Sequence, residues 1–171
     1  MRETRRRPGG MGGGWVALVL GAAILVAGAL AQAAPPDVLD QSTADSMVQR
    51  CLSRSKPSAW PPFSIAVVDA AGALILLRRQ DGASAITADA ALLKAQTAAR
   101  LGGPTAALVA MSQDAPTRDL MMLLRVTADP GGVPVKLAAR TIGAIGVSGG
   151  TAEQDVKCAK AAISDFEAEK K

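Results

Sequence analysis

The sequence predicts an α+β fold in which helices pack against an antiparallel β-sheet. Three observations favour this class: apolar β-type runs occur in groups, an Ala-rich helical stretch separates the groups, and helical patterns lie at both ends of the domain. Grouped strands argue against a doubly wound parallel sheet, because that architecture places a helix between successive strands.

The first part of the domain is expected to form a helix and a β-hairpin. The helix begins near Ser42 and runs to about Ser53, with its apolar residues on one side. Two apolar runs follow within residues 63–82. They are joined at Asp69-Ala70-Ala71-Gly72, where the aspartate can cap the turn and the glycine can take the left-handed conformation.

The rest of the domain is expected to contain helices, about three strands and a terminal helix. The segment 113–132 holds an apolar cluster between Asp- and Pro-rich flanks, and it fits either a strand or a helical turn. The other expected elements are a helix capped by Thr87 and stopped by Gly102-Gly103-Pro104, a shorter helix from Thr105 through Met111, strands in VPVKLAA and TIGAIGVSG, and a helix from Thr151 to about Phe166.

Residues 1–33 have the pattern of a secretory signal peptide. An arginine-rich start precedes an apolar run from Trp15 to Leu30, and Ala31-Gln32-Ala33 offers a small-x-small cleavage site. A retained N-terminal anchor is the alternative, although the run is short for a membrane span of about 20 residues. We therefore expect a periplasmic or secreted domain over residues 34–171, with no membrane contact after cleavage.

The charge of the expected mature domain argues against nucleic acid as a partner. Without residues 1–33 the chain keeps 15 of its 19 basic and 14 of its 15 acidic residues, a net charge near +1. The chain also has no tyrosine and only two phenylalanines, so it lacks an aromatic platform for stacking bases.

The two cysteines are expected to form a disulfide. Cys51 and Cys158 lie in helical patterns at opposite ends of the domain, in a chain predicted to enter an oxidising compartment. A bridge across roughly 100 residues contributes up to about 4–5 kcal/mol in the chain-entropy treatment. The alternative is a pair of buried free thiols.

The absence of histidine removes several classes of chemistry. The chain has none, which excludes Ser-His-Asp and Cys-His catalysis and any histidine ligand to zinc or haem iron. It also lacks a GxxxxGK[ST] phosphate loop and carboxylates at metal-binding spacing. No catalytic residue is predicted, and an enzyme that uses Lys94 as a base or Schiff-base amine is kept only as an alternative.

Several side chains have both a structural and a functional interpretation. Lys94 lies mid-helix without an acidic residue one turn away, so it is either solvated or in contact with the sheet or a bound anion. The segment Arg78–Gly82 is either a solvated rim or a ligand or subunit contact. Met111, Met121 and Met122 are either gap fillers in the core or soft ligands to haem iron.

The stretch GAIGVSGGTAEQD, residues 143–155, combines a glycine-rich strand with the start of a helix. Thr151 and Gln154 have the spacing of a capping box, and two acidic residues, Glu153 and Asp155, occupy the first helical turn. A helix N-terminus can bind an anion, but these acidic residues would repel a phosphate. The stretch is therefore interpreted as a structural corner, with a ligand-contacting loop as the alternative.

Four motifs together resemble the GlcG/HbpS family, which is related to the C-terminal domain of PduO-type proteins. They are IAVVDAAGALILLRRQDGA, ITADAALLKAQTAARLGGPT, GGVPV and GAIGVSGGTAEQDVKCAKAAI, in the family's order. The resemblance implies a profilin-like fold with a five-stranded antiparallel sheet, assembly into a homo-oligomer, and binding of haem or another tetrapyrrole. An accessory or small-molecule-binding role beside a periplasmic oxidation pathway is the alternative.

The chain departs from the family pattern at two points. Haem-binding members are thought to use a histidine, which is absent here, and the usual Arg-Met-Asp-Gly is Arg79-Gln80-Asp81-Gly82. A histidine ligand to haem therefore cannot be carried over. The candidate cofactor-binding residues that do match the family are Asp81, Gly82, Lys94, Thr97, Gly149, Gly150 and Thr151.

Overall fold

The computed structural model of the chain describes residues 38–55 and 59–169. The predicted signal peptide and its cleavage site after Ala33 lie outside the described residues. Among the residues described, no helix is long and apolar enough to cross a membrane.

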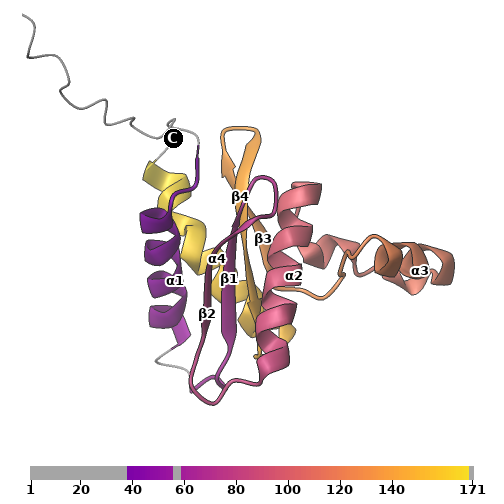
Figure 1. The fold of residues 1–171 in the computed structure, drawn as a ribbon, viewed down its shortest axis with the longest axis horizontal. Coiled ribbons are helices and arrows are strands. Elements are labelled where there is room, and N and C mark those ends of the chain that lie inside the picture. The colour runs from indigo at the N-terminus through magenta and orange to yellow at the C-terminus, as the bar shows by residue number, and fades with distance from the viewer. Residues whose placement is uncertain (1–37, 56–58, 170–171) are drawn as a thin grey trace, which may run out of the picture. The chain divides into compact units, whose positions relative to one another are not determined.

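Helices and an antiparallel sheet make up the described domain, which confirms the α+β class (Figure 1). Its four strands are arranged in the order β2-β1-β4-β3, and every neighbouring pair is antiparallel. The predicted fifth strand is not confirmed. The elements are α1 (Gln41–Ser55), β1 (Ser64–Asp69), β2 (Leu74–Arg79), α2 (Ala85–Leu101), η2 (Thr105–Leu108), η3 (Met111–Gln113), α3 (Ala115–Leu123), β3 (Gly132–Leu137), β4 (Arg140–Ser148) and α4 (Ala152–Glu169).

The predicted hairpin between β1 and β2 is confirmed, including the roles of its turn residues. Asp69 Oδ1 accepts hydrogen bonds from the backbone N–H groups of Ala71 and Ala73, at 2.9 and 2.8 Å. Gly72 has a φ of 84°, a conformation that a residue with a Cβ rarely adopts. Local turn chemistry therefore sets the register of the first strand pair.

Helix α2 begins earlier than its sequence predicts. The helix starts at Ala85 after Ser84, not after Thr87. The Thr87 hydroxyl lies within the first turn, 2.6 Å from the Ser84 carbonyl oxygen and 2.8 Å from the hydroxyl of Ser64 in β1. The end of α2 is as predicted, because Gly102 adopts the left-handed conformation that closes the helix.

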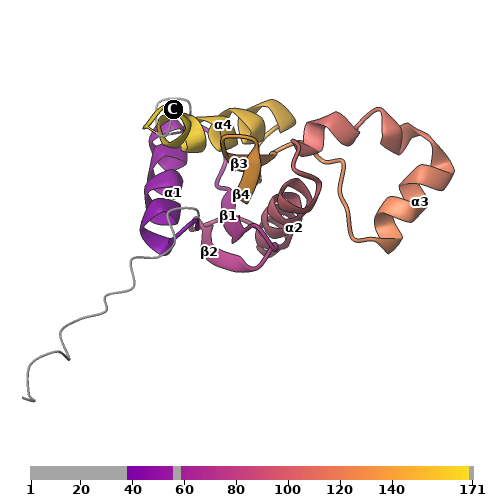
Figure 2. The ribbon, with the colours of Figure 1, turned by 90° about the horizontal axis from the view of Figure 1, so that it is seen from above.

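The expected helix after Thr105 is instead two short 3₁₀ turns, and α3 follows them. The Asp114 side chain caps α3 by accepting a hydrogen bond from the Thr117 N–H at 3.0 Å, and Pro116 lies in the first turn. This start explains why most of the apolar cluster in the ambiguous segment 113–132 lies in a helix rather than a strand. We call residues 105–125 the arm; it lies beyond α2, on the side away from α1 and α4 (Figures 1 and 2).

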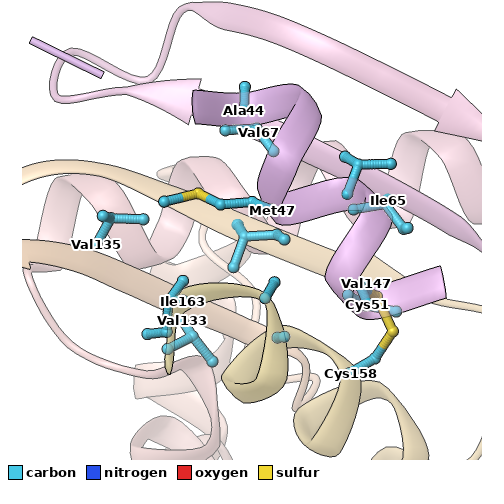
Figure 3. Packing of buried hydrophobic residues seen from close by; sticks show 14 of the residues in the cluster. Ala44, Met47, Cys51, Ile65, Val67, Val133, Val135, Val147, Cys158 and Ile163 are labelled. Carbon is cyan, nitrogen blue, oxygen red and sulfur yellow. A yellow bond between two sulfur atoms is a disulfide. The ribbon is translucent and has the colours of Figure 1, made fainter. Parts of the chain in front are cut away.

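The sheet separates two apolar layers. On one face, α1 and α4 pack on alternate strand residues such as Ile65 and Val67 (Figure 3). Cys51 of α1 and Cys158 of α4 form the predicted disulfide, with 4.7 Å between their Cα atoms. The covalent bond therefore joins the first and last helices of the domain.

On the opposite face, α2 approaches the sheet through alanines and glycines. Its buried alanines pack against Ala66, Val68 and Ala144. A Cβ added at Gly146 of β4 would collide with the backbone carbonyl oxygen of Ala91 in α2. Glycine is therefore required where the α2 backbone touches the strand.

Candidate ligand site

Lys94 is the centre of a buried polar cluster beneath α2. Its side chain is only 2% exposed, and its ammonium nitrogen lies 3.1 Å from the Val147 carbonyl oxygen. The same nitrogen pairs with Asp129 Oδ2 at 2.9 Å and with Asp155 Oδ2 at 3.1 Å. Of the two interpretations of Lys94, the solvated lysine is therefore wrong, and contact with the sheet is correct.

Asp155 completes this cluster from the first turn of α4. Its second carboxylate oxygen, Oδ1, accepts a hydrogen bond from the Gly150 N–H at 3.0 Å. Burial raises the pKa of Asp155, while the charge and hydrogen bond of Lys94 and the Gly150 N–H oppose this rise. Three oxygens surround the lysine nitrogen: those of Val147 and Asp155 belong to buried residues, whereas the Asp129 side chain is 55% exposed. This arrangement is suited to holding elements together rather than to attacking a substrate.

Two threonines beside the cluster hold the chain at the first residue of the arm and just after its end. Thr97 Oγ1 accepts a hydrogen bond from the Thr127 N–H at 3.2 Å. Thr105 Oγ1 donates to the Asp129 carbonyl oxygen at 2.8 Å and accepts from the Gly132 N–H at 3.0 Å. The candidate residues Lys94 and Thr97 therefore belong to one group of polar contacts. We call this group, formed by Lys94, Thr97, Thr105, Asp129 and Asp155, the polar seam. The observed partners of Lys94 and Thr97 are backbone groups and aspartates of the chain.

The glycine corner before α4 has the geometry predicted for a structural corner. The Thr151 N–H donates to Gln154 Oε1 at 2.8 Å, and the Gln154 N–H donates to Thr151 Oγ1 at 3.3 Å, which confirms the capping box. Gly149 has a φ of 133°, and a Cβ there would lie 2.7 Å from the Phe63 Cα. The corner is packed directly against the start of β1.

Gly82, in the turn that begins with Asp81, packs against Pro62, two residues before the start of β1. Gly82 has a φ of 83°, and a Cβ at this position would be 3.5 Å from Pro62 Cγ. The segment Pro62–Phe63 therefore lies close to both the Asp81–Gly82 turn and Gly149. The structure brings the predicted residues to neighbouring places, but it does not gather them around one open pocket.

An open hollow of about 370 Å³ lies beside the Asp81–Gly82 turn. Gln80, one of the lining residues, is held in place because its Oε1 accepts a hydrogen bond from the Phe63 N–H at 2.9 Å. The Trp60 ring forms an edge-to-face pair with Phe63, with 6.3 Å between ring centroids. The lining residues are Trp60, Pro62, Arg78, Arg79, Gln80 and Asp81.

This hollow combines a cationic and an aromatic surface. Arg78 is exposed, while Arg79 is held by a hydrogen bond from its Nη1 to the Ala83 carbonyl oxygen at 2.6 Å. A guanidinium and an indole that line the same hollow suit a planar ligand that carries a carboxylate. The sequence analysis singled out the segment 78–82 but missed Trp60. Its position directly before Pro61-Pro62, at the approach to β1, was the available signal.

The chain offers few groups that could coordinate haem iron. It contains no histidine or tyrosine, and both cysteines are in the disulfide. Within residues 38–55 and 59–169, no group of three His, Cys, Asp or Glu side chains could hold a metal ion. Met111 and Met122 are exposed, so the interpretation of these two methionines as core gap fillers is wrong. Their thioethers are weak candidate ligands.

A four-stranded antiparallel sheet, with α1 and α4 on one face and α2 on the other, defines a small α+β domain. The sequence matches the family described as "Haem degrading protein HbpS-like" over residues 39–164, and the chain belongs to this HbpS-like family. The resemblance of the four sequence motifs to the GlcG/HbpS family is therefore confirmed.

Individual relatives agree with this assignment. An uncharacterized 15.0 kDa protein from the dhaT-dhaS intergenic region of Citrobacter freundii is 37% identical over 108 residues, which span 61% of this chain and 76% of the relative. The crystal structure of Klebsiella pneumoniae ORFY superposes with a TM-score of 0.71 at 30% identity, covering 76% of this chain and 91% of ORFY. The PduOC:Heme complex gives a TM-score of 0.69 at 26% identity and covers 74% and 94%.

Proposed function

We propose that this protein is an exported haem- or tetrapyrrole-binding protein that acts as a homo-oligomer. The observation that carries the proposal is the family match over residues 39–164, which spans nearly all of the described domain. A second support is the likeness to PduOC, whose structure was determined as a haem complex. Export is supported by the arginine-rich and apolar order of residues 1–33.

The residues present fit the organic part of haem better than its iron. No imidazole, phenolate or free thiolate is available for the metal. Arg78 can pair with a propionate carboxylate, and the Trp60 ring can contact the macrocycle in the hollow beside Asp81 and Gly82. Haem would supply a redox-active iron there, while the protein would bind and orient the porphyrin through its ring and carboxylates.

A titration of the purified protein with hemin and with iron-free protoporphyrin IX tests this function. We expect a saturable change in the Soret band with both ligands and affinities within about tenfold, because no strong protein ligand to iron contributes. Saturable binding of neither ligand would refute tetrapyrrole binding. Binding of hemin alone would refute the proposed ring-and-carboxylate mode.

Matched variants locate the binding surface. Arg78→Ala should weaken hemin binding about tenfold, a loss of about 1.4 kcal/mol, because one charge-assisted contact is removed. Arg54→Ala is the control, since it removes another exposed arginine from the last turn of α1. Equal affinities of the two variants would place the ligand elsewhere.

Export has its own measurement. If residues 1–33 act as a signal peptide, the protein recovered from the periplasm or medium of an expressing bacterium begins at Ala34. N-terminal sequencing of that material reads the cleavage site. Recovery only in the membrane fraction with residues 1–33 attached would instead indicate a retained anchor.

A further inference from the structure

Helix α3 places large apolar side chains in solvent. None of its nine residues is buried. Met122 is 72% exposed and Leu123 is 79% exposed, values unusual for apolar residues so close together. The exposed large hydrophobic residues of the arm are Val109, Met111, Leu120, Met122, Leu123 and Leu124. Contiguous exposed apolar surface of this kind marks an interaction site.

The apolar residues at the end of α3 lie on all sides of the helix instead of forming one stripe. Residues 120–124 are five consecutive apolar side chains, and at about 100° per residue they point in every direction. The last turn of α3 is thus apolar on all sides, and helix surface of this kind is normally buried. An isolated helix also needs roughly 12–15 residues to be even marginally stable. The arm therefore requires a partner that is present whenever the protein is folded. This partner has to cover more than one side of α3.

The ends of the arm are held in place by the body of the domain. At its first residue, the Thr105 hydroxyl bonds to the Asp129 carbonyl oxygen and to the Gly132 N–H. Near its far end, Arg100 Nη1 of α2 donates to the Leu124 carbonyl oxygen at 3.2 Å. These bonds hold the arm beyond α2, where both views place it (Figures 1 and 2).

The charges of the arm favour a second copy of this chain over a charged partner. Residues 105–125 contain two aspartates and two arginines, so the arm has no net charge to attract nucleic acid or anionic lipid. Arg118 and Asp119 are adjacent in the middle of α3. Across a two-fold axis, Arg118 of each copy can face Asp119 of the other, which is the self-complementary pattern of an isologous interface.

We propose that the arm is a self-association surface, in which α3 of one copy packs against α3 and the neighbouring apolar residues of a second copy. The proposal rests on the homo-oligomer part of the proposed function and deepens it by naming the surface. It does not depend on haem. Burial of the exposed leucines and methionines supplies the attraction, and the Arg118–Asp119 pairs set the antiparallel orientation.

Light scattering of the purified protein after size-exclusion chromatography tests this assembly. The wild type should be a dimer or larger, and Met122→Glu/Leu123→Glu should reduce its mass, because both substitutions place charge inside the interface. Ile86→Glu is the matched control, since Ile86 is 67% exposed on the first turn of α2, outside the arm. A monomeric wild type, or an arm variant with unchanged mass, would overturn the proposal.

A charge swap keeps the test valid if the double glutamate variant fails to fold. Arg118→Asp places acidic side chains opposite each other and should weaken the assembly at least tenfold. The double variant Arg118→Asp/Asp119→Arg restores opposite charges across the two-fold axis and should recover most of the wild-type affinity. Equal affinities of the wild type and both variants would contradict the proposed pairing.

The assembly and haem hypotheses fail in distinguishable ways. Hemin titration of the wild type decides tetrapyrrole binding whatever its oligomeric state. Light scattering without any ligand decides assembly. An oligomeric wild type that binds no hemin would therefore remove the haem proposal and leave the arm interface standing, and a monomer that binds hemin would do the reverse.

Discussion

The two faces of the sheet are packed in different ways, although successive residues of the same strands supply both. The face under α1 and α4 is filled by Val, Ile and Met side chains and is closed by a disulfide (Figure 3). The face under α2 is filled by alanines and by glycines that touch backbone atoms directly. Large side chains can change rotamer, whereas a backbone carbonyl cannot move without its helix. The α2 face should therefore tolerate added volume poorly.

The largest expected effect comes from removing the disulfide on the first face. Cys51→Ala/Cys158→Ala opens a cross-link over a sequence separation of 107 residues, and we expect a loss of about 4 kcal/mol in the free energy of unfolding. Alanine is chosen as the replacement because, unlike serine, it places no hydroxyl group in the apolar core. Urea denaturation of the variant and the oxidised wild type measures the difference. A loss below about 1 kcal/mol would show that the apolar core alone holds α1 against α4.

Lys94→Met tests the polar seam at the edge of the α2 face. At neutral pH it leaves the buried Asp155 carboxylate without its cation, and we expect a loss of about 3 kcal/mol in the free energy of unfolding. A raised pKa means that the folded protein binds the Asp155 proton more tightly than the unfolded chain does. The resulting stabilisation is complete below the ordinary aspartate pKa and is lost as the pH rises through the raised value.

The loss caused by Lys94→Met should consequently shrink between pH 7 and pH 4. The double variant Lys94→Met/Asp155→Leu should be more stable at pH 7 than Lys94→Met alone, because it buries no unpaired charge. Chemical denaturation at several pH values measures both trends. A loss independent of pH, or a double variant less stable than the single one, would contradict this account of the seam.

Gly146→Ala tests the backbone contact between β4 and α2, with a smaller expected effect of about 2 kcal/mol. The added methyl group collides with the Ala91 carbonyl oxygen and lies 2.6 Å from the Ala95 nitrogen. Gly103→Ala is the matched control, because a Cβ there meets nothing within 4 Å. Thermal unfolding of the two variants gives the comparison. Equal melting temperatures would show that α2 can move away from the sheet at little cost.

The features predicted correctly from the sequence are those with local causes. The Asp69–Gly72 turn and the Thr151 capping box each lie within a few residues and make their bonds there. The disulfide was predicted because only two cysteines exist and both fit helices. By contrast, the start of α2 was misplaced because the Thr87 hydroxyl also contacts Ser64, which is 23 residues away.

The candidate site was harder to predict because its partners are distant in sequence. Asp155 lies 61 residues from Lys94, so helical spacing around the lysine could not reveal the pair. The glycine requirement at position 149 comes from contact with Phe63, which is far along the chain. The arm was ambiguous for a different reason: five consecutive apolar residues show neither the period of a strand nor that of an amphipathic helix.

The bond between Cys51 and Cys158 makes most of the domain a covalent ring. A protease that cuts the exposed arm opens the ring without separating its parts, because the fragments on either side of the cut stay joined through sulfur. The nicked protein keeps a single mass on a gel run without reductant and yields two fragments with reductant. The ring thus keeps the domain in one covalent piece after a single cut.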